Sequence, residues 1–582
     1  MSFKLHECLL PDGKLCADLP LYVRLGGQSS YSFTERTLYL EAGGVSRFNT
    51  YFGAFSLGKW QRHTRLRSLN MSLDLEGEAL VRVWGANPAG GEELVKEWHV
   101  TGASPDQRFA ISDAVATLPY ESLYVEIAAL KPTRVGGVAF TTEQDRSREV
   151  GLAIVITTFN RFQDIAATAR RLHGFLDRAH DHDIWIKVFI VNNGDTIDVE
   201  ESEHLKVLDN PNLGGAGGFA RGLSEAKALP GCTHCLFMDD DAACEVTALE
   251  RAHAFLSYSE DPALSIAGAM LKKESKFIQH EAGAAFDGLV RPLKNGLDLR
   301  DYAQVLDNET PVHVDYGAWW FFLFPVQRAH RFPFPFFVRG DDIEFSLSHD
   351  FRIVTLNGIA TWQEDFAAKA GPMVTYLSTR STLATALLHG GWGRVLLWFA
   401  GAAMKSSFAL CYDRTMAQCQ AAMDVLAGPD FWAEHIDLSE RRARLKAQTR
   451  YEHPVDEDAE RLLDDFQFHR EESIGHRCFR FATLNGHLLP ARLFKRRSIV
   501  SAEFSLSPFA RVAFRRQGVL YKDAGRPVFL ARHDKPYFFS VAWRSLALWC
   551  RLIWHGRRLR RAYRHAHGDL TSEVFWKQQF GE

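Results

Sequence analysis

The chain has 582 residues, 46% hydrophobic and 24% charged, a globular balance that suffices for about three or four domains. Its formal net charge of −3 argues against attraction of the whole protein to nucleic acid, so no nucleic-acid partner is predicted. The nine cysteines are scattered, and the pair Cys232 and Cys235 lacks the second pair that a zinc site normally uses. We therefore expect free structural thiols in a reducing compartment rather than a disulfide framework.

The first residues carry no basic region followed by an apolar stretch, so they do not resemble a signal peptide. No run reaches the roughly 18–20 apolar residues of a spanning helix. The nearest candidate, 395–403, is short and lies between Arg394 and Lys405. We expect a cytoplasmic protein that can lie peripherally on the inner face of the cell membrane.

Residues 1–148 are predicted to form a β-sandwich or jelly-roll-like domain. Short alternating stretches at 21–25, 37–41 and 79–84 are separated by Gly, Pro, Asn and Asp, which is typical of such domains. The aromatic residues within 51–60 are expected to fill its core, and a sugar-binding face is the alternative.

Residues 149–380 are predicted to form an α/β catalytic domain, because strands and helices alternate there. The strongly apolar run 150–156 begins after the polar residues 145–149 and reads as a buried strand. The elements that follow are a helix over 164–179, a strand over 185–191, a helix over 217–228 and a strand over 235–238. This order predicts a parallel sheet with right-handed crossovers, a nucleotide-binding type of fold.

Residues 381–582 are predicted to be mainly helical. The stretch 438–463 is rich in charge and is typical of a solvated helical face. Near the end, an apolar, tryptophan-containing stretch at 542–554 precedes clustered arginines at 555–564. A helix lying flat on an anionic bilayer and a helix docked on its own protein with a solvated basic face are both open interpretations.

The strongest motif is the triplet Asp239, Asp240 and Asp241, directly after a predicted buried strand. Ligands of open α/β sheets bind at the carboxyl ends of strands. Adjacent carboxylates repel one another, and a hard divalent cation relieves that repulsion while its other positions accept phosphate oxygens. An acidic loop in solvent is the alternative, and the position at a strand end favours the metal site.

Polar residues also follow the first two strands of the domain. Phe159 can stack on a base, Arg161 can contact phosphate, and the backbone of Thr157 and Thr158 can contact base edges. Asn193 after the second strand is a further base contact. Each of these alone can equally be an ordinary turn residue.

The segment 210–222, NPNLGGAGGFARG, is rich in glycine and opens a helix. Glycines let backbone approach a ligand closely, and a helix amino end favours phosphate, so Asn212 and Gly214 are predicted to bind the donor. The spacing fits neither a Rossmann fingerprint nor a P-loop. A flexible connector is the alternative.

Two further motifs point to an acceptor site. In 338–345, VRGDDIEF, Asp341 and Asp342 are candidate bases for a hydroxyl proton, and one of them can also cap a helix. In 316–322, YGAWWFF, either Trp319 or Trp320 can line a sugar site while the other packs inward.

The ordered motifs TTFNR, NPNLGGAGGFARG, FMDDDA, GAWWFF and RGDDIEF resemble those of inverting family 2 glycosyltransferases with the GT-A fold. More narrowly, they are similar to bacterial galactofuranosyltransferases of the kind that polymerise mycobacterial cell-wall galactan. The segment 49–55, NTYFGAF, and the plan of sandwich, catalytic domain and helical region share the likeness. The resemblance implies a GT-A domain with a mixed, mainly parallel sheet.

The same resemblance implies UDP-galactofuranose as donor, Mn²⁺ or Mg²⁺ as metal, a growing and usually lipid-linked glycan as acceptor, and self-association into a homo-oligomer. Its implied site residues are these: Asp239 and Asp241 on the metal; Asp240 beside the ribose or diphosphate; Asp342 as base, with Asp341 positioning the acceptor; Trp319, Trp320 and Glu281 at the acceptor; and Arg380 near the diphosphate.

One departure concerns the metal. The family often has a histidine ligand after the tryptophan of the strand that follows the base, and here Gln363 follows Trp362. Gln363 can still offer an oxygen, Glu364 or Asp365 can substitute, or fewer side chains can hold the ion.

We therefore expect an inverting transfer in which Asp342 takes the acceptor proton. Within enzymes, a transferase using UDP-glucose, UDP-galactopyranose or dTDP-rhamnose is the alternative. From another class, a non-catalytic glycan-binding or assembly protein is the alternative, which the intact acidic motifs argue against.

Overall fold

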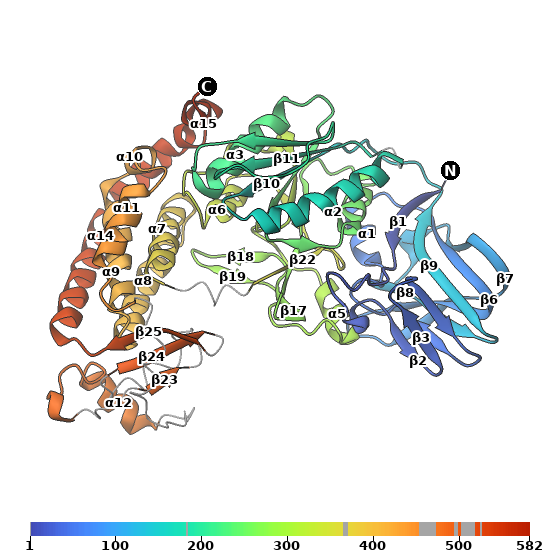
Figure 1. The fold of residues 1–582 in the computed structure, drawn as a ribbon, viewed down its shortest axis with the longest axis horizontal. Coiled ribbons are helices and arrows are strands. Elements are labelled where there is room, and N and C mark those ends of the chain that lie inside the picture. Colours follow the sequence, from blue (N-terminus) through green and yellow to red (C-terminus); the bar gives the residue numbers. More distant parts are fainter. Residues whose placement is uncertain are drawn as a thin grey trace.

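The computed structural model describes residues 2–181, 184–364, 371–452, 473–493, 499–501, 518–523 and 526–582. Figure 1 shows a β-rich N-terminal part, a central α/β part and a C-terminal part in which helices stand side by side. The predicted boundaries at 148 and 380 stay predictions. The first sheet ends at Thr142 and the second begins at Leu152, whereas the helix Pro372–His389 spans position 380.

The N-terminal part is built on a nine-stranded antiparallel sheet with the order β2-β5-β8-β6-β9-β4-β3, to which β1 adds on β9 and β7 on β6. Strand β6 alternates buried and partly exposed residues over most of its length, the period-2 pattern of a strand with one face on a core. The strands are β1 Phe3–Glu7, β2 Arg24–Gly26, β3 Ser29–Ser32, β4 Thr37–Leu40, β5 Val45–Arg47, β6 Leu69–Ala86, β7 Glu92–Ser112, β8 Ser122–Ala129 and β9 Thr133–Thr142.

The aromatic residues within 51–60 lie in the core, as the first of the two interpretations predicts. Tyr51, Phe52, Phe55 and Trp60 are each at most 2% exposed. Phe52 also meets Trp362 of the central part, with ring centroids 5.8 Å apart. The N-terminal part thus packs directly against the strand that ends at Gln363.

The central part contains the predicted mixed, mainly parallel sheet, with the order β12-β11-β10-β13-β20-β15-β21. Strand β10 pairs in parallel with β11 on one side and with β13 on the other, so the chain adds later strands first on one side of β10 and then on the opposite side. Such a switch point leaves a crevice outside the carboxyl ends of the two strands. The strands are β10 Leu152–Thr158, β11 Ile186–Asn192, β12 Leu205–Asp209, β13 His234–Asp239, β15 Leu264–Ala267, β20 Phe322–Pro325 and β21 Arg352–Val354.

A second, four-stranded sheet with the order β14-β22-β16-β17 lies beside this crevice. Its strands are β14 Ala243–Cys244, β16 Ala269–Lys272, β17 Ser275–Glu281 and β22 Ala360–Gln363, and a hairpin of β18 Ala284–Phe286 and β19 Val290–Pro292 follows β17. The pairing of Ala243 with Trp362 brings the end of β22 next to the acidic triplet. The helices up to this point are α1 Leu57–His63, α2 Phe162–Asp181, α3 Gly214–Ala228, α4 Thr247–Ser257, α5 Tyr302–Glu309 and α6 Asp341–Leu347.

The C-terminal part is mainly helical, and the long helix α14 runs beside α7, α8 and α9 (Figure 1). The helices are α7 Pro372–His389, α8 Trp392–Phe408, α9 Tyr412–Ala427, α10 Asp430–Glu434, α11 Ser439–Gln448, α12 Ile474–Ala482, α14 Lys535–Leu570 and α15 Glu573–Phe580. A small sheet of β23 Ile499–Ser501, β24 Gly518–Asp523 and β25 Arg526–Arg532 was not expected from the sequence.

The second half of the predicted charged face, from 453, lies outside the described residues. Across the parts of the chain that the structure describes, none of the helices combines the length and apolarity needed to cross a bilayer.

Helix α15 returns the chain to the central part, where it lies against α3. Trp576 is buried there, and its indole nitrogen donates to the Pro333 carbonyl at 2.9 Å. Arg221 of α3 pairs with Glu582 beyond the helix. The C-terminal end therefore braces the sheet that carries the crevice. The nine cysteines are all free thiols, as predicted.

Candidate active site

A cavity of about 410 Å³ opens at the switch point of the main sheet. Most of the predicted site residues line it together, although they come from six separate stretches of sequence. They are Thr157, Thr158, Phe159, Arg161, Asn193, Asn212, Gly214, Asp239, Asp240, Asp241, Trp319, Trp320, Asp341 and Asp342. The carboxyl ends of β10 and β13 supply one wall, and the start of α6 supplies another.

The carboxylates of the acidic triplet differ in their contacts and in their pKa values. Asp240 accepts hydrogen bonds from Thr158 at 2.8 Å and from Arg161 at 3.1 Å, and the Arg161 guanidinium also contacts Asp241 at 2.5 Å. Burial, partly opposed by the charge of Arg161, raises the pKa of Asp240 to about 6. Burial, and after it the charges of Asp241 and Asp240, raise the pKa of Asp239 to about 7. The triplet is thus a site of excess negative charge.

Gln363 lies between the outer two carboxylates of the triplet. Its amide nitrogen donates to Asp239 at 3.2 Å and to Asp241 at 3.1 Å. The residue is buried at the end of β22, where a histidine would be expected from the family resemblance. Asp365, one of the alternative ligands, lies outside the described residues, and Glu364 is exposed with Lys273 at 3.8 Å.

The tips of the first two strands differ in how freely their side chains face the cavity. Phe159 is 49% exposed, which leaves its ring available for stacking. Asn193 is buried, donates to the Gly214 carbonyl at 3.1 Å and accepts from Asn210 at 2.8 Å. Asn193 therefore joins the strand tip to the glycine-rich segment and has little freedom to contact a ligand by itself.

The glycine-rich segment has two roles in the structure, of which only one faces the cavity. Gly214 has a φ of 68°, and a Cβ there would lie 2.1 Å from the Phe337 carbonyl oxygen. Gly218 and Gly222 instead allow α3 to pack closely on β10, because a Cβ at these positions would lie 1.7 Å from the Thr157 hydroxyl and 2.1 Å from Val155. Close helix packing, which the sequence analysis did not consider, explains the later glycines.

The motif at 338–345 forms a strained turn into α6. Phe337 and Arg339 both have a φ of 69°, and Gly340 precedes the helix with a φ of 87°. Left-handed conformations are costly for residues with a side chain and tend to persist at functional sites. This turn places Asp341 and Asp342 on the cavity wall.

The two aspartates of that motif are buried to different effect. Burial raises the pKa of Asp342 to about 6, although backbone hydrogen bonds, including one from Ile343 at 2.8 Å, and the charge of Arg339 act against it. Burial and the charge of Asp342 raise the pKa of Asp341 well above its ordinary range. At neutral pH the pair therefore offers one carboxylate that can accept a proton and one carboxyl that keeps its own.

Both tryptophans line the cavity, and each is largely buried. Trp320 donates its indole hydrogen to the Gly268 carbonyl at 2.9 Å. Trp319 packs among Phe219, Phe237 and Phe345, and its indole nitrogen has no hydrogen-bond partner within the described residues. An unpaired buried donor at a cavity wall is well placed to bind a ligand hydroxyl.

Two predicted residues do not line the cavity. Arg380 is 1% exposed within the helical part, where it donates to the Phe336 carbonyl and stacks over Tyr376 and Trp432. Its guanidinium lies between these two aromatic rings, and its predicted place near a diphosphate stays a prediction. Glu281 is 2% exposed at the end of β17, and burial together with the charge of Asp342 raises its pKa to about 8.

The cavity also has lining residues that the sequence analysis missed. They are Gly215, Phe219, Phe337, Val338, Arg339 and Arg442. The first five lie within or beside motifs already noted, so proximity in sequence could have suggested them. Gln363, considered above as a metal ligand, also lines the cavity. Arg442 belongs to α11, in the charged stretch interpreted as solvated, and its guanidinium lies over the Phe337 ring at 5.2 Å. No local signal marks it.

The chain is similar to known proteins over most of its length. Residues 9–122 match the family model described as Galactofuranosyltransferase 2 N-terminal. The chain is 27% identical over 580 residues to the galactofuranosyltransferase GlfT2 of Mycolicibacterium smegmatis, covering 91% of this chain and 88% of that one. It is also 27% identical over 442 residues to GlfT2 of Mycobacterium tuberculosis, covering 69% of this chain and 68% of that one.

A solved mannosyltransferase from Pyrobaculum calidifontis, in complex with GDP-Man and Mn²⁺, shares 14% identity over 42% of this chain and 64% of its own, with a TM-score of 0.25.

The long alignments and the matched N-terminal model identify the chain as a glycosyltransferase. Within that class it is similar to the mycobacterial galactofuranosyltransferases GlfT2, as the motif resemblance predicted.

Proposed function

We propose that this enzyme transfers galactofuranose from UDP-galactofuranose to a hydroxyl of a growing glycan, in a metal-dependent reaction that inverts the anomeric configuration on a GT-A fold. The observation that carries the proposal is the shared cavity: the acidic triplet and the Asp341–Asp342 pair line the same space. The names of the two mycobacterial relatives suggest the sugar. A displacement at a sugar carbon needs one group of residues that binds the diphosphate through a metal and a separate base that takes the acceptor proton.

The side chains at the triplet suit Mn²⁺ or Mg²⁺. Asp239 and Asp241 are close enough for one amide nitrogen of Gln363 to contact both. The raised pKa of Asp239 comes from burial and, after it, from the like charges of its neighbours, which a cation would relieve. The oxygen and nitrogen of an amide have nearly the same shape, so a flipped Gln363 would present its oxygen as a third ligand. When bound, the ion offsets the negative charge that develops on the departing diphosphate.

The donor is expected to lie over the tips of β10 and β11. Phe159 would stack on the base. The Arg161 guanidinium, which pairs with Asp240 and Asp241, would also contact a phosphate group of the donor. The amino end of α3 at Gly214 adds backbone N–H groups that favour an anion. Arg442 from α11 supplies a further cation on the same cavity wall.

Asp342 would act as the base. Its carboxylate takes the proton of the acceptor hydroxyl while the hydroxyl oxygen forms a bond to the anomeric carbon, and the bond from that carbon to UDP breaks on the opposite face. Asp341, with a pKa well above its ordinary range, keeps its proton and can donate a hydrogen bond that positions the acceptor. Trp319 and Trp320 would form the floor on which the acceptor sugar lies.

A lipid-linked acceptor and peripheral attachment to an anionic membrane are supported by helix α14. Its exposed stripe includes Trp543 at 72%, Leu546 at 50% and Trp554 at 85% exposure. The helix carries seven arginines, and its only acidic residue is Asp569 near its end. An apolar face flanked by arginines is typical of helices that lie in the membrane interface. Self-association stays a prediction.

The test is a transfer assay with purified enzyme, UDP-galactofuranose and a galactose-terminated acceptor, with linkage and anomeric configuration read from the product. We expect turnover with Mn²⁺ or Mg²⁺, none with excess chelator, and a product configuration opposite to that of the donor. UDP-galactopyranose, UDP-glucose and dTDP-rhamnose are the comparison donors. Faster turnover with one of these donors would contradict the assignment of galactofuranose as the transferred sugar. Tight glycan binding with no UDP release from any donor would contradict catalysis altogether.

A further inference from the structure

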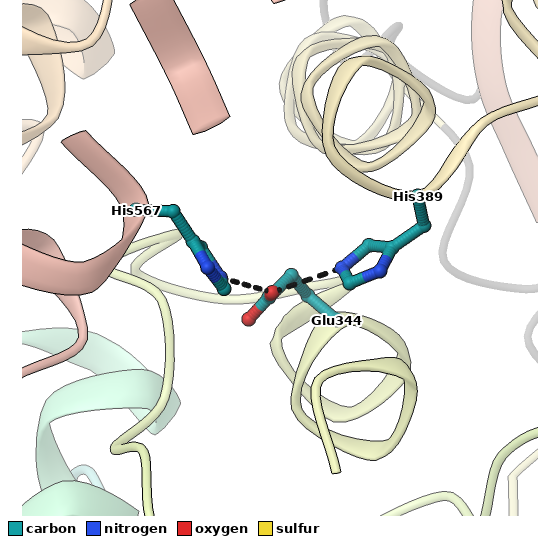
Figure 2. A group of neighbouring side chains, drawn as sticks. All are labelled: Glu344, His389 and His567. Atoms are coloured by element: carbon teal, nitrogen blue, oxygen red, sulfur yellow. Dashed lines mark hydrogen bonds and ion pairs between the residues drawn. The ribbon is translucent and has the colours of Figure 1, made fainter. Parts of the chain in front are cut away.

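A second cluster of potential metal ligands lies behind the proposed base, on the other side of α6. Figure 2 shows Glu344, His389 and His567 turned toward one another from α6, α7 and α14. His567 Nε2 is 2.6 Å and His389 Nε2 is 3.1 Å from the same oxygen, Glu344 Oε1. One ligand atom from each residue lies within 4.8 Å of the other two. These three residues are called the rear cluster below.

The polar contacts of Glu344 are unevenly shared between its two oxygens. Besides the two imidazoles, the Ser348 hydroxyl donates to Oε1 at 2.5 Å. The other oxygen, Oε2, is buried and has no hydrogen-bond partner among the described residues. Three polar groups on one oxygen and none on its twin is a poor arrangement for a carboxylate held by hydrogen bonds alone, because an unpaired buried acceptor is costly.

We propose that the rear cluster binds a zinc ion, with His389 Nε2, His567 Nε2 and the Glu344 carboxylate as ligands. Two imidazole nitrogens with one carboxylate form an established zinc ligand set. Zinc bonds of roughly 2.0–2.2 Å place neighbouring ligand atoms about 3.4 Å apart, so His567 would move back by less than about 1 Å. An ion between the three side chains would also give Glu344 Oε2 a partner, and water would fill the remaining position.

Burial and charge at the rear cluster favour a cation. Glu344 is fully buried, and its side chain is ionised in the fold: burial acts to raise its pKa, yet the hydrogen bonds from His389 and His567 hold that pKa well below the usual range. The His389 and His567 side chains keep 18% and 11% exposure, so water and an ion can reach them from one side. Phe334 stacks on the His567 ring at 6.1 Å and restricts its orientation.

The position of the rear cluster suggests what the ion does. Its ligands come from sequence positions 344, 389 and 567, so one ion would join α6, α7 and α14. Helix α6 begins with Asp341 and Asp342, within one turn of Glu344. The zinc would therefore fix the helix that carries the proposed base, and it would be separate from the cation proposed at Asp239 and Asp241.

Zinc content and cobalt spectroscopy of the full chain test the proposal without using activity. We expect one zinc per chain after dialysis against excess Mg²⁺, and a tetrahedral visible absorption band when Co²⁺ replaces it. His389→Asn and His567→Asn should each lose the zinc and the band. His565→Asn is the matched control, because His565 is exposed on the same helix two residues away and should keep both. Asp239→Asn combined with Asp241→Asn should also keep both.

Retention of the same zinc by His389→Asn and His567→Asn would overturn the proposal. So would a wild-type chain that holds no zinc and gives no tetrahedral band with Co²⁺, since the rear cluster would then be joined by hydrogen bonds only. If either histidine variant does not fold by circular dichroism, the wild-type cobalt spectrum decides alone. Glu344→Gln then serves as the milder variant, and it should weaken Co²⁺ binding by at least tenfold.

Discussion

The two sides of helix α6 hold carboxylates under opposite electrostatic conditions. On the cavity side, burial raises the pKa values of Asp342 and Asp341, and the charge of Asp342 raises that of Asp341 further. On the rear side, Glu344 is equally buried, yet two imidazoles lower its pKa. Burial alone therefore does not decide the charge of a carboxylate in this protein. What decides it is whether donors or cations reach the carboxylate from neighbouring helices.

Glu281 sharpens this difference because it is a second buried glutamate on the cavity side. Burial and the charge of Asp342 raise its pKa to about 8, so at neutral pH it holds a proton. Glu344 and Glu281 thus share residue type and burial and differ in charge state.

Asp342→Asn should lower the transfer rate by about 1,000-fold or more, because an amide cannot take the acceptor proton. The UDP affinity, measured by calorimetry, should change little. Asp341→Asn is the matched control: it keeps a hydrogen-bond donor and should lose far less activity. Equal activity of Asp342→Asn and wild type would remove Asp342 from the role of base.

The transfer rate should fall about tenfold per pH unit below pH 6, because the base is protonated below its raised pKa of about 6. The stability contribution of the same group has the opposite sign. Its folded pKa exceeds the unfolded value of about 4, so this contribution is present below pH 4 and is lost as pH rises through 6. Between these values the thermal midpoint of wild type, without metal, should fall relative to that of Asp342→Asn, because the amide resembles the protonated acid and does not titrate. A rate that is flat across this window would contradict the assignment.

Glu344→Gln should destabilise the protein by about 3 kcal/mol, because it removes an ionised partner from two buried imidazoles. Glu281→Gln should cost less than about 0.5 kcal/mol at pH 7, since glutamine resembles the protonated form that is already present. Thermal midpoints of the two variants, measured side by side, check the comparison. Equal losses would mean that the two glutamates carry the same charge.

Gln363→Ala should weaken Mn²⁺ binding by about tenfold, as expected when a neutral oxygen ligand is lost. Gln363→Glu is the paired variant, and it should bind Mn²⁺ more tightly than wild type because it adds a carboxylate to the site. Titration of the metal dependence of transfer measures both. The reverse order of affinities would exclude Gln363 from the metal site.

The double variant Trp543→Ala and Trp554→Ala should bind vesicles of anionic lipid several-fold more weakly, while its rate with a short soluble acceptor stays unchanged. Val574→Ser removes an exposed apolar residue from α15 and serves as the control. Unaltered vesicle sedimentation of the double variant would favour the other interpretation of α14, a helix docked on its own protein.

Local pattern was a good guide wherever one element decides the outcome. The apolar run before Thr157 predicted β10, and the polar residues after it were predicted at a ligand site because parallel strands end at the same edge. The three carboxylates at and just after the end of β13, and the two aspartates that begin α6, were found in the same way. Each of these predictions needed only a strand end or a helix start.

Contacts between residues that lie far apart in the sequence could not be predicted from local sequence patterns. The family resemblance placed Arg380 near the diphosphate, and only the fold shows that Trp432, from a different helix, lies over its guanidinium. Arg442 looked like part of a solvated face, yet α11 packs so that it lines the cavity. The later glycines of the 210–222 segment serve helix packing, because β10 lies directly beneath α3.

The sequence by itself determined the alternation of strands and helices, the positions of the acidic motifs and the likeness to galactofuranosyltransferases, since all of these are written in neighbouring residues. Only the tertiary structure decided the charge state of each buried carboxylate and the meeting of Glu344, His389 and His567. The physical reason is that a pKa depends on burial and on charges within a few ångströms, and in this protein those neighbours lie up to 223 residues away along the chain.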